Sequence, residues 1–357
     1  MTPLLLDACG AVTPVGLSAF GTCAALRAGV SRIADAIPMP PPDDPLKGAR
    51  VKARRAMRTN PRDWLFNLAA KALRECTQGS TAQSIALLVC RPEPFRKHPG
   101  LEGLRGDEIL ATLRTKTKIP FDSRSQVIDS GAAGLIEALK VARDLLRGRL
   151  VDQCVVGGFD SLLTSEDVKR LRDFNRIHSD VNPQGVIPAE GAVFLAVSAA
   201  GRGSPFVPLA TISGFGTGHE PNAVNGPKYA LGQGMTTAAL AALADAQVHE
   251  RDVGFIVSNA NGERYAGLET MLAHARAYRT RREGIPVTYP ASSAGEIGVG
   301  SSALAILVAA TSIARGYAPA ARAVCELGSE GTLRGACVVE ASPLKPAFVA
   351  PGRRRAR

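Results

Sequence analysis

The sequence predicts an α/β protein built from two similar halves. Short apolar runs, typical of buried strands, alternate along the chain with stretches of helical periodicity. The pattern occurs twice, and each half contains a turn of small residues followed by an apolar helix, at 126–143 and at 290–314. Alternating strands and helices favour buried sheets. Because small side chains allow close approach of backbones, we expect these two helices to pack at the centre of the fold.

The first half contains most of the predicted elements. In chain order we expect a strand at 3–8, a turn at 10–16, a helix at 18–29, an irregular proline-rich stretch at 36–48, a helix at 55–76, a strand at 84–90, a loop at 91–108, a short helix at 108–115, the strand, turn and helix of 126–143, a strand at 152–161, a helix at 165–173 and a strand at 189–197. In the first helix, the spacing of Phe20, Cys23 and Leu26 predicts that they face inward.

A Gly- and Pro-containing stretch at 199–206 is the best boundary between the halves. We therefore divide the chain into an N-terminal half (1–203), a C-terminal half (204–345) and a basic tail (346–357) that is expected to be disordered. The second half repeats the pattern of the first, with strands at 207–212 and 253–257, helices at 235–247 and 265–276, and the small-residue turn and helix that end near residue 314.

The composition is that of a soluble globular protein, with 45% hydrophobic and 21% charged residues among 357. The first residues resemble no signal peptide, which predicts a cytoplasmic protein. The seven cysteines form no CxxC pair and the five histidines show no metal spacing, so we expect reduced thiols, no metal and no cofactor. The net charge of +11 reflects either a solvated tail or attraction to an acidic partner; no aromatic–basic pattern favours nucleic acid.

Several segments, in order along the chain, resemble motifs of the β-ketoacyl synthases, condensing enzymes of the thiolase fold. They lie at 10–16, 129–142, 155–158, 189–192, 252–262 and 292–303. The resemblance implies a thiolase-like five-layer αβαβα fold made of two pseudo-repeated halves. It also implies that the strand at 125–128 pairs with a second subunit across a two-fold axis.

Enzymes of that family use a cysteine nucleophile, two histidines and a lysine, and every one of these positions differs here. The cysteine position falls on Gly131, the lysine on Ala291, the second histidine on Glu296, and the first histidine on Asn259, or on Asn261 if a short gap is allowed. Glycine has no nucleophile, asparagine does not shuttle protons near neutral pH, and a glutamate disfavours a developing enolate. We therefore expect no catalytic residue at these positions. The family's glycine-rich closing loop is matched only weakly, by 329–335.

Ser130 is the fallback nucleophile. It would need a base, and His219 could supply one only if its loop folds inward; the simpler interpretation is that Ser130 caps the following helix. Asn259 and Asn261 are interpreted as turn residues that hold backbone.

Glu296 has two interpretations. It either pairs with a helix N-terminus or an arginine, or it is an acid with a raised pKa in a modified site. Asp160 and Glu190 are expected to accept hydrogen bonds from loop N–H groups.

The resemblance favours the cysteine-less branch of the family, the chain-length-factor subunits. It implies a catalytically silent subunit that pairs with an active ketosynthase, contacts an acyl carrier protein and shapes the acyl pocket in type II fatty-acid or polyketide biosynthesis, aryl-polyene pathways included. Two alternatives remain open: a diverged acyltransferase or hydrolase that uses Ser130, and a homodimeric acyl-binding protein.

Overall fold

A computed structural model describes residues 2–39, 44–52, 60–199 and 207–342 of the chain. Ten strands form one continuous sheet in the order β10-β9-β11-β12-β8-β1-β7-β6-β4-β5. The strands of the first half are β1 (Leu4–Val12), β4 (Ile85–Cys90), β5 (Gln126–Ile128), β6 (Gln153–Ser161) and β7 (Glu190–Ala199). Those of the second half are β8 (Ala210–His219), β9 (Phe255–Ser258), β10 (Val287–Thr288), β11 (Arg322–Gly328) and β12 (Leu333–Ala341).

The two halves of this sheet have the same topology. Numbered within its own half, each set of five strands follows the order 3-2-4-5-1. Strands 2, 3 and 4 of each half are parallel to one another, and strand 5 is antiparallel to both of its neighbours. The halves join where β1 pairs with β8 over three residues. The predicted internal repeat is therefore present in the fold.

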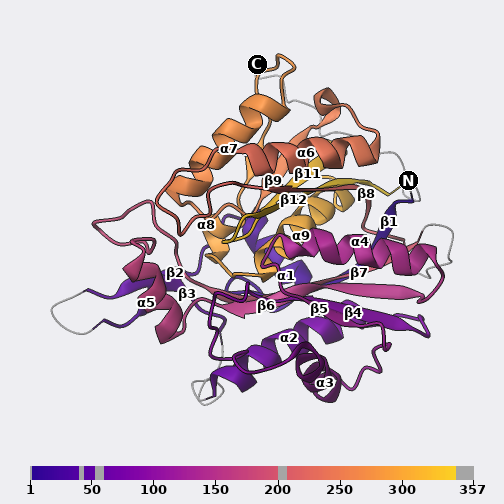
Figure 1. The fold of residues 1–357 in the computed structure, drawn as a ribbon. Helices are drawn as coiled ribbons and strands as arrows, with labels where there is room; N and C mark the ends of the chain where they lie inside the picture. The colour runs from indigo at the N-terminus through magenta and orange to yellow at the C-terminus, as the bar shows by residue number, and fades with distance from the viewer. Residues whose placement is uncertain (1, 40–43, 53–59, 200–206, 343–357) are drawn as a thin grey trace.

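Helices divide the molecule into five layers (Figure 1). On the outside of the first half-sheet lie α2 (Pro61–Thr77) and α3 (Gly106–Thr117), and on the outside of the second lie α6 (Gln233–Ala246) and α7 (Arg264–Ala277). Between the half-sheets lie α4 (Gly134–Arg147) and α9 (Gly300–Ala314), which contact strands of both. This is the αβαβα arrangement of the thiolase fold.

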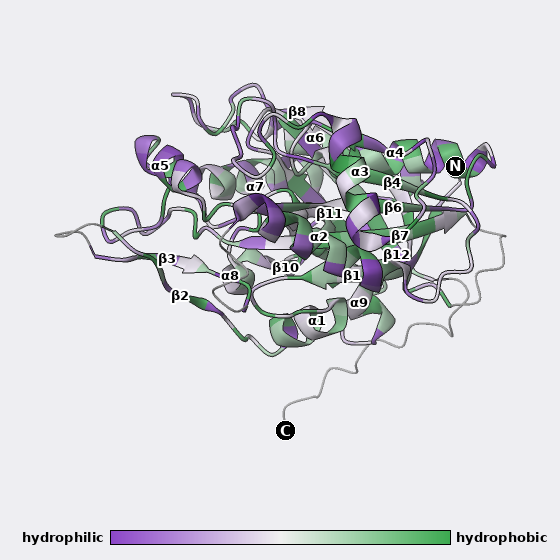
Figure 2. Ribbon diagram, turned by 90° about the horizontal axis from the view of Figure 1, so that it is seen from below, coloured by the Kyte–Doolittle hydropathy of each residue, from purple (hydrophilic) through white to green (hydrophobic). Residues whose placement is uncertain are grey.

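The central layer follows from composition. Helix α9 contains no charged residue and buries 13 of its 15 residues, as expected for a helix that is covered on every side. Helix α4 has an apolar face formed by Leu135, Ala138, Leu139 and Ala142, all of which are buried. Both central helices confirm the sequence prediction. Figure 2 shows the apolar residues concentrated on the strands and the central helices, whereas α5 (Ser165–Asp173) is mostly hydrophilic.

Within the first 50 residues, the extent of the first strand and the orientation of Phe20 differ from the prediction. Strand β1 continues to Val12 through the expected turn, because Gly10 lets α2 pass close: a Cβ there would lie 1.9 Å from the carbonyl oxygen of Ala72. In α1 (Ala19–Arg27), Cys23 is buried but Phe20 is 65% exposed, so its inward placement was wrong.

The stretch predicted as irregular contains parts of β2 (Ile33–Ile37) and β3 (Leu46–Ala49), which form a separate two-stranded sheet. Helix α5 matches its predicted bounds and packs with these strands in a small apolar cluster. The short helical turns η2 (Glu250–Asp252) and α8 (Ala291–Ala294) complete the described elements.

Two further predictions fall outside the described residues: the boundary at 203/204 and the basic tail at 346–357. Both stay predictions. Among the described helices, none combines the length and the apolar character that crossing a membrane requires.

Candidate functional site

The predicted nucleophile turn lies between β5 and α4. β5 is the last strand of the sheet and pairs only with β4 among the described strands, so it is an edge strand. Gly131 follows it with φ of 68°, in the left-handed region that favours glycine. Its N–H donates to the carbonyl oxygen of Arg91, 3.1 Å away. The turn expected from the sequence is present, and Gly131 is buried within it.

The space beside Gly131 is filled by the carboxyl group of Glu93. A Cβ at residue 131 would lie 2.4–2.6 Å from the Glu93 carboxyl atoms, closer than any real contact. The Glu93 side chain is fixed by the N–H of Gly331, which donates to Oε1 at 2.8 Å. Burial raises the pKa of Glu93 above its ordinary value. A carboxyl group from a neighbouring loop thus occupies the place where a side chain at 131 would lie.

The start of α4 is capped from the other half of the molecule. Ser329 Oγ accepts the N–H of Ala133 at 2.8 Å and donates to the carbonyl oxygen of Ser130 at 2.8 Å. The predicted cap by Ser130 is wrong, because the helix begins at Gly134 and the hydroxyl of Ser130 makes no hydrogen bond within the described residues. Ser329 lies in the loop between β11 and β12, so this loop is fastened to the α4 terminus.

Asn259 holds backbone, as predicted. Its Oδ1 accepts the N–H of Gly328 at 2.7 Å and its Nδ2 donates to the carbonyl oxygen of the same residue at 2.9 Å. Nδ2 also lies 3.1 Å from Ser301 Oγ. Both ends of the amide are therefore engaged. Asn261 forms a local turn, in which its Oδ1 accepts the N–H of Glu263 at 3.2 Å.

Glu296 is buried just before the start of α9. Only 9% of its surface is exposed, and Oε1 accepts the N–H of Gly298 at 2.8 Å. Burial raises its pKa to about 8. No arginine pairs with it among the described residues. Ala291, the other substituted position, is the first residue of α8.

Asp160 and Glu190 accept hydrogen bonds from loop N–H groups, as predicted. Asp160 binds the N–H of Val299 at 3.1 Å, and Glu190 binds that of Val51 at 2.9 Å. Asp160 also pairs with the buried guanidinium of Arg96, which the sequence did not indicate.

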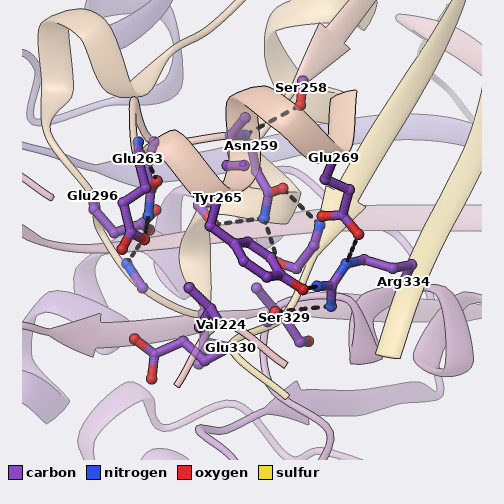
Figure 3. A pocket seen from close by; sticks show the side chains of 18 of the residues that line it. Val224, Ser258, Asn259, Glu263, Tyr265, Glu269, Glu296, Ser329, Glu330 and Arg334 are labelled. Atoms are coloured by element: carbon purple, nitrogen blue, oxygen red, sulfur yellow. Dashed lines mark hydrogen bonds and ion pairs between the residues drawn. The ribbon is translucent and has the colours of Figure 1, made fainter. Parts of the chain in front are cut away.

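A cavity of about 90 Å³ brings several of these residues together. Asn259 and Glu296 line it (Figure 3). Asn261 and Ala132, next to Gly131, belong to the same lining. Ser130 and Ala291 are not part of the lining. No histidine among the described residues reaches the cavity, and His219 is exposed at the end of β8. The described lining therefore brings no histidine to Ser130.

Buried arginines organise the cavity wall, and the sequence patterns did not single them out. Arg176, in the loop after α5, binds Glu263 through two bonds of 2.7 and 2.8 Å and Glu330 at 3.1 Å. Arg334, only 1% exposed, binds Glu269 at 2.6 Å and the carbonyl oxygens of the 329–331 loop.

Although burial opposes ionisation, the charges of Arg176 and then Arg170 hold the pKa of Glu330 below its ordinary value. Arg170 belongs to α5 and contacts Glu330 at 2.8 Å. Glu330 lies where the family's closing loop was expected, so a charged residue fixed by two arginines stands at that place. Charged residues at dispersed sequence positions give no local pattern, and only the fold brings them together.

The raised pKa of Glu296 predicts a pH-dependent stability. An unfolded glutamic acid ionises near pH ~4.3, whereas the folded carboxyl keeps its proton to about pH 8. Between these values the folded state binds more protons, so the free energy of unfolding falls as pH rises. In the wild type this fall should amount to roughly 1 kcal/mol per pH unit between pH 5 and 8. We expect it to be absent from the Glu296→Gln variant.

Denaturant unfolding of the wild type and of E296Q at several pH values measures this difference. Glu166→Gln, on the exposed first turn of α5, is the matched control and should follow the wild type. Parallel stability curves for the wild type and E296Q would contradict the prediction.

Comparison with known proteins finds likeness in structure only. No family model matches the chain, and no curated relative does. The ishigamide ketosynthase/chain length factor superposes with a TM-score of 0.78 at 15% identity, over 95% of this chain and 99% of that one. The AntDE:AntF structure contains a type II polyketide synthase acyl carrier protein in complex with its ketosynthase. It superposes with a TM-score of 0.75 at 14% identity, over 95% of this chain and 99% of that one.

The ketosynthase from module 6 of the bacillaene synthase of Bacillus subtilis 168 gives a TM-score of 0.77 at 12% identity, over 95% of this chain and 72% of that one. At such identities the likeness concerns the fold. Together with the strand order and the five layers, it shows that this chain has the thiolase-type fold of the ketosynthases and chain length factors.

Proposed function

We propose that this chain is a catalytically silent ketosynthase-like subunit of the chain-length-factor type. It would pair with an active ketosynthase in type II fatty-acid or polyketide biosynthesis, aryl-polyene pathways included, and work in the cytoplasm. One observation carries the proposal: the nucleophile position is Gly131, and the carboxyl group of Glu93 fills the space where the Cβ of a cysteine would lie. Condensation needs a nucleophile at this point, so the chemistry has to come from a partner.

Two features support a partner. β5 is an edge strand, and an open edge in a soluble protein is normally covered. The solved structures with the same fold include a ketosynthase/chain length factor and a ketosynthase in complex with an acyl carrier protein. We therefore propose an active ketosynthase as partner at this edge, and an acidic acyl carrier protein as a second partner attracted by the net charge of +11.

The cavity refines the proposed role in the acyl pocket. Its volume of about 90 Å³ is well below the ~300 Å³ of an ordinary ligand pocket, and charged side chains line it. An acyl chain does not fit such a space. The protein would therefore shape the pocket of the growing acyl chain from its side of the subunit interface.

Co-expression with a cysteine-containing ketosynthase tests the proposal. We expect a stable heterodimer on native mass spectrometry, and elongation of a malonyl-carrier substrate by the complex but not by this chain alone. Val127→Asp on β5 should reduce complex formation, whereas Val181→Asp, at a 92% exposed loop position, should not. Thermal melting of both variants verifies folding. Elongation by the isolated chain, or a homodimer indifferent to any ketosynthase, would refute the proposal.

A further inference from the structure

The cavity wall has fewer positive charges than negative ones. Its described lining contains three charged arginines against five glutamates, which are Glu93, Glu263, Glu269, Glu296 and Glu330. Each arginine is already paired: Arg176 with Glu263 and Glu330, Arg334 with Glu269, and Arg96 with Asp160 and Asp167 behind the wall. Glu93 and Glu296 are left without an ion-pair partner among the described residues.

The two remaining acids differ in their surroundings. Glu93 accepts the N–H of Gly331 and lies against Gly131, just before α4, where the positive end of a 14-residue helix favours negative charge. Glu296 lies near α9, but Asp160 accepts the N–H of Val299 at that helix start. Glu296 accepts the N–H of Gly298 at Oε1 and a hydrogen bond from the side chain of Asn261, and both donors are uncharged. Glu296 is therefore the acid whose charge is least compensated.

We propose that the cavity binds a small primary ammonium ion, held by the carboxylate of Glu296. The protein supplies no counter-charge at Glu296, so this buried carboxyl is protonated when the cavity is empty and ionises when a cation meets it. An ammonium group needs only hydrogen-bond acceptors, whereas no group of three metal-ligating side chains exists among the described residues.

The other walls fit the alkyl part of such a ligand. Val224, Met235 and Ala266 are apolar lining residues, and the ring of Tyr265 extends into the same space (Figure 3). An aromatic ring beside an ammonium group adds favourable cation–π attraction. The volume of about 90 Å³ limits the ligand to a few non-hydrogen atoms. The ligand class is therefore a short primary alkylammonium.

Binding must release a proton. The protonated acid and the ammonium ion exchange for a carboxylate–ammonium pair and one proton, which passes to solvent. Glu263, Glu330 and Asn261 lie around Glu296, and Arg176 neutralises part of the charge of the two glutamates. Affinity should rise as pH approaches 8, the pH at which Glu296 loses its proton unaided.

Titration calorimetry with methylammonium chloride tests the proposal at constant ionic strength. We expect saturable binding that is tighter at pH 8 than at pH 6.5. At pH 6.5, two buffers of different ionisation enthalpy should reveal the release of close to one proton. Glu296→Gln should weaken binding at least tenfold and abolish the proton release.

Three variants complete the design. Glu296→Asp keeps the charge and should keep the pH dependence, Glu93→Gln should weaken binding less than E296Q, and Glu166→Gln on the surface should change nothing. The absence of saturable binding, equal binding by E296Q, or equal binding of tetramethylammonium, which has no N–H donor, would overturn the proposal. It does not rest on subunit pairing, so its failure leaves the proposed function untouched.

Discussion

Replacement of Arg176 by alanine should lower the free energy of unfolding by about 3–5 kcal/mol. Its side chain is 6% exposed, and the guanidinium binds Glu263, Glu330 and the side-chain oxygen of Asn225, the last at 2.8 Å. These partners come from three different loops. Without the arginine, Glu263 is left buried without a counter-charge, and Glu330 keeps only Arg170. Few single substitutions combine lost packing with an unpaired buried charge in this way.

Denaturant unfolding at pH 7 measures the loss. Lys169→Ala, which breaks an exposed pair with Asp173, is the control and should cost less than about 1 kcal/mol. If the unpaired charge causes the damage, adding Glu263→Gln to the Arg176→Ala variant should restore part of the stability. A double variant that is no more stable than R176A would assign the loss to packing instead.

Restoring a cysteine at Gly131 should fail to restore a reactive thiol. The Cβ of Gly131→Cys would clash with the Glu93 carboxyl group, and the residue would have to keep a φ of 68°. Strain and overpacking of this kind each cost about 1–3 kcal/mol. We expect G131C to be clearly less stable than the wild type and its new thiol to react slowly with iodoacetamide.

Removal of the obstacle gives the complementary result. In the double variant G131C with Glu93→Ala, the thiol gains space, so stability should partly recover and one additional cysteine should be alkylated. Six of the seven natural cysteines are buried, and burial raises the pKa of several of them, including Cys76 and Cys90, so the background should be low. Equal alkylation of G131C with and without Glu93 would show that the carboxyl group does not block this position.

The sequence predicted the central framework because its signals are local. Periodicity identified α4 and α9, and small residues marked the turn at Gly131. By contrast, β11 and β12 were not predicted. Buried charged side chains, Glu326 and Arg334, interrupt their apolar runs, and their partners come from distant parts of the chain. Burial of a charge depends on an ion pair that no local pattern reveals.

For the candidate site, the sequence predicted which positions form it but not how the side chains are arranged. Alignment with a family motif located Gly131, Asn259 and Glu296, and two of these line the cavity. Glu93 was not identified, because it belongs to a loop without periodicity and reaches Gly131 from 38 residues away. The glycine at the nucleophile position can be recognised in the sequence, whereas the residue that fills the space beside it cannot.

The central position of α4 has a consequence for synthesis. Its apolar face contacts β6 and β4 on one side and β8 and β12 on the other. The second pair of strands is complete only at Ala341, roughly 200 residues after the helix ends. At ordinary translation rates that delay lasts about 10–40 s. During this time the nascent chain exposes an unfinished core, so ribosome-associated chaperones should bind the stretch between Leu135 and Leu146 until the second half has emerged.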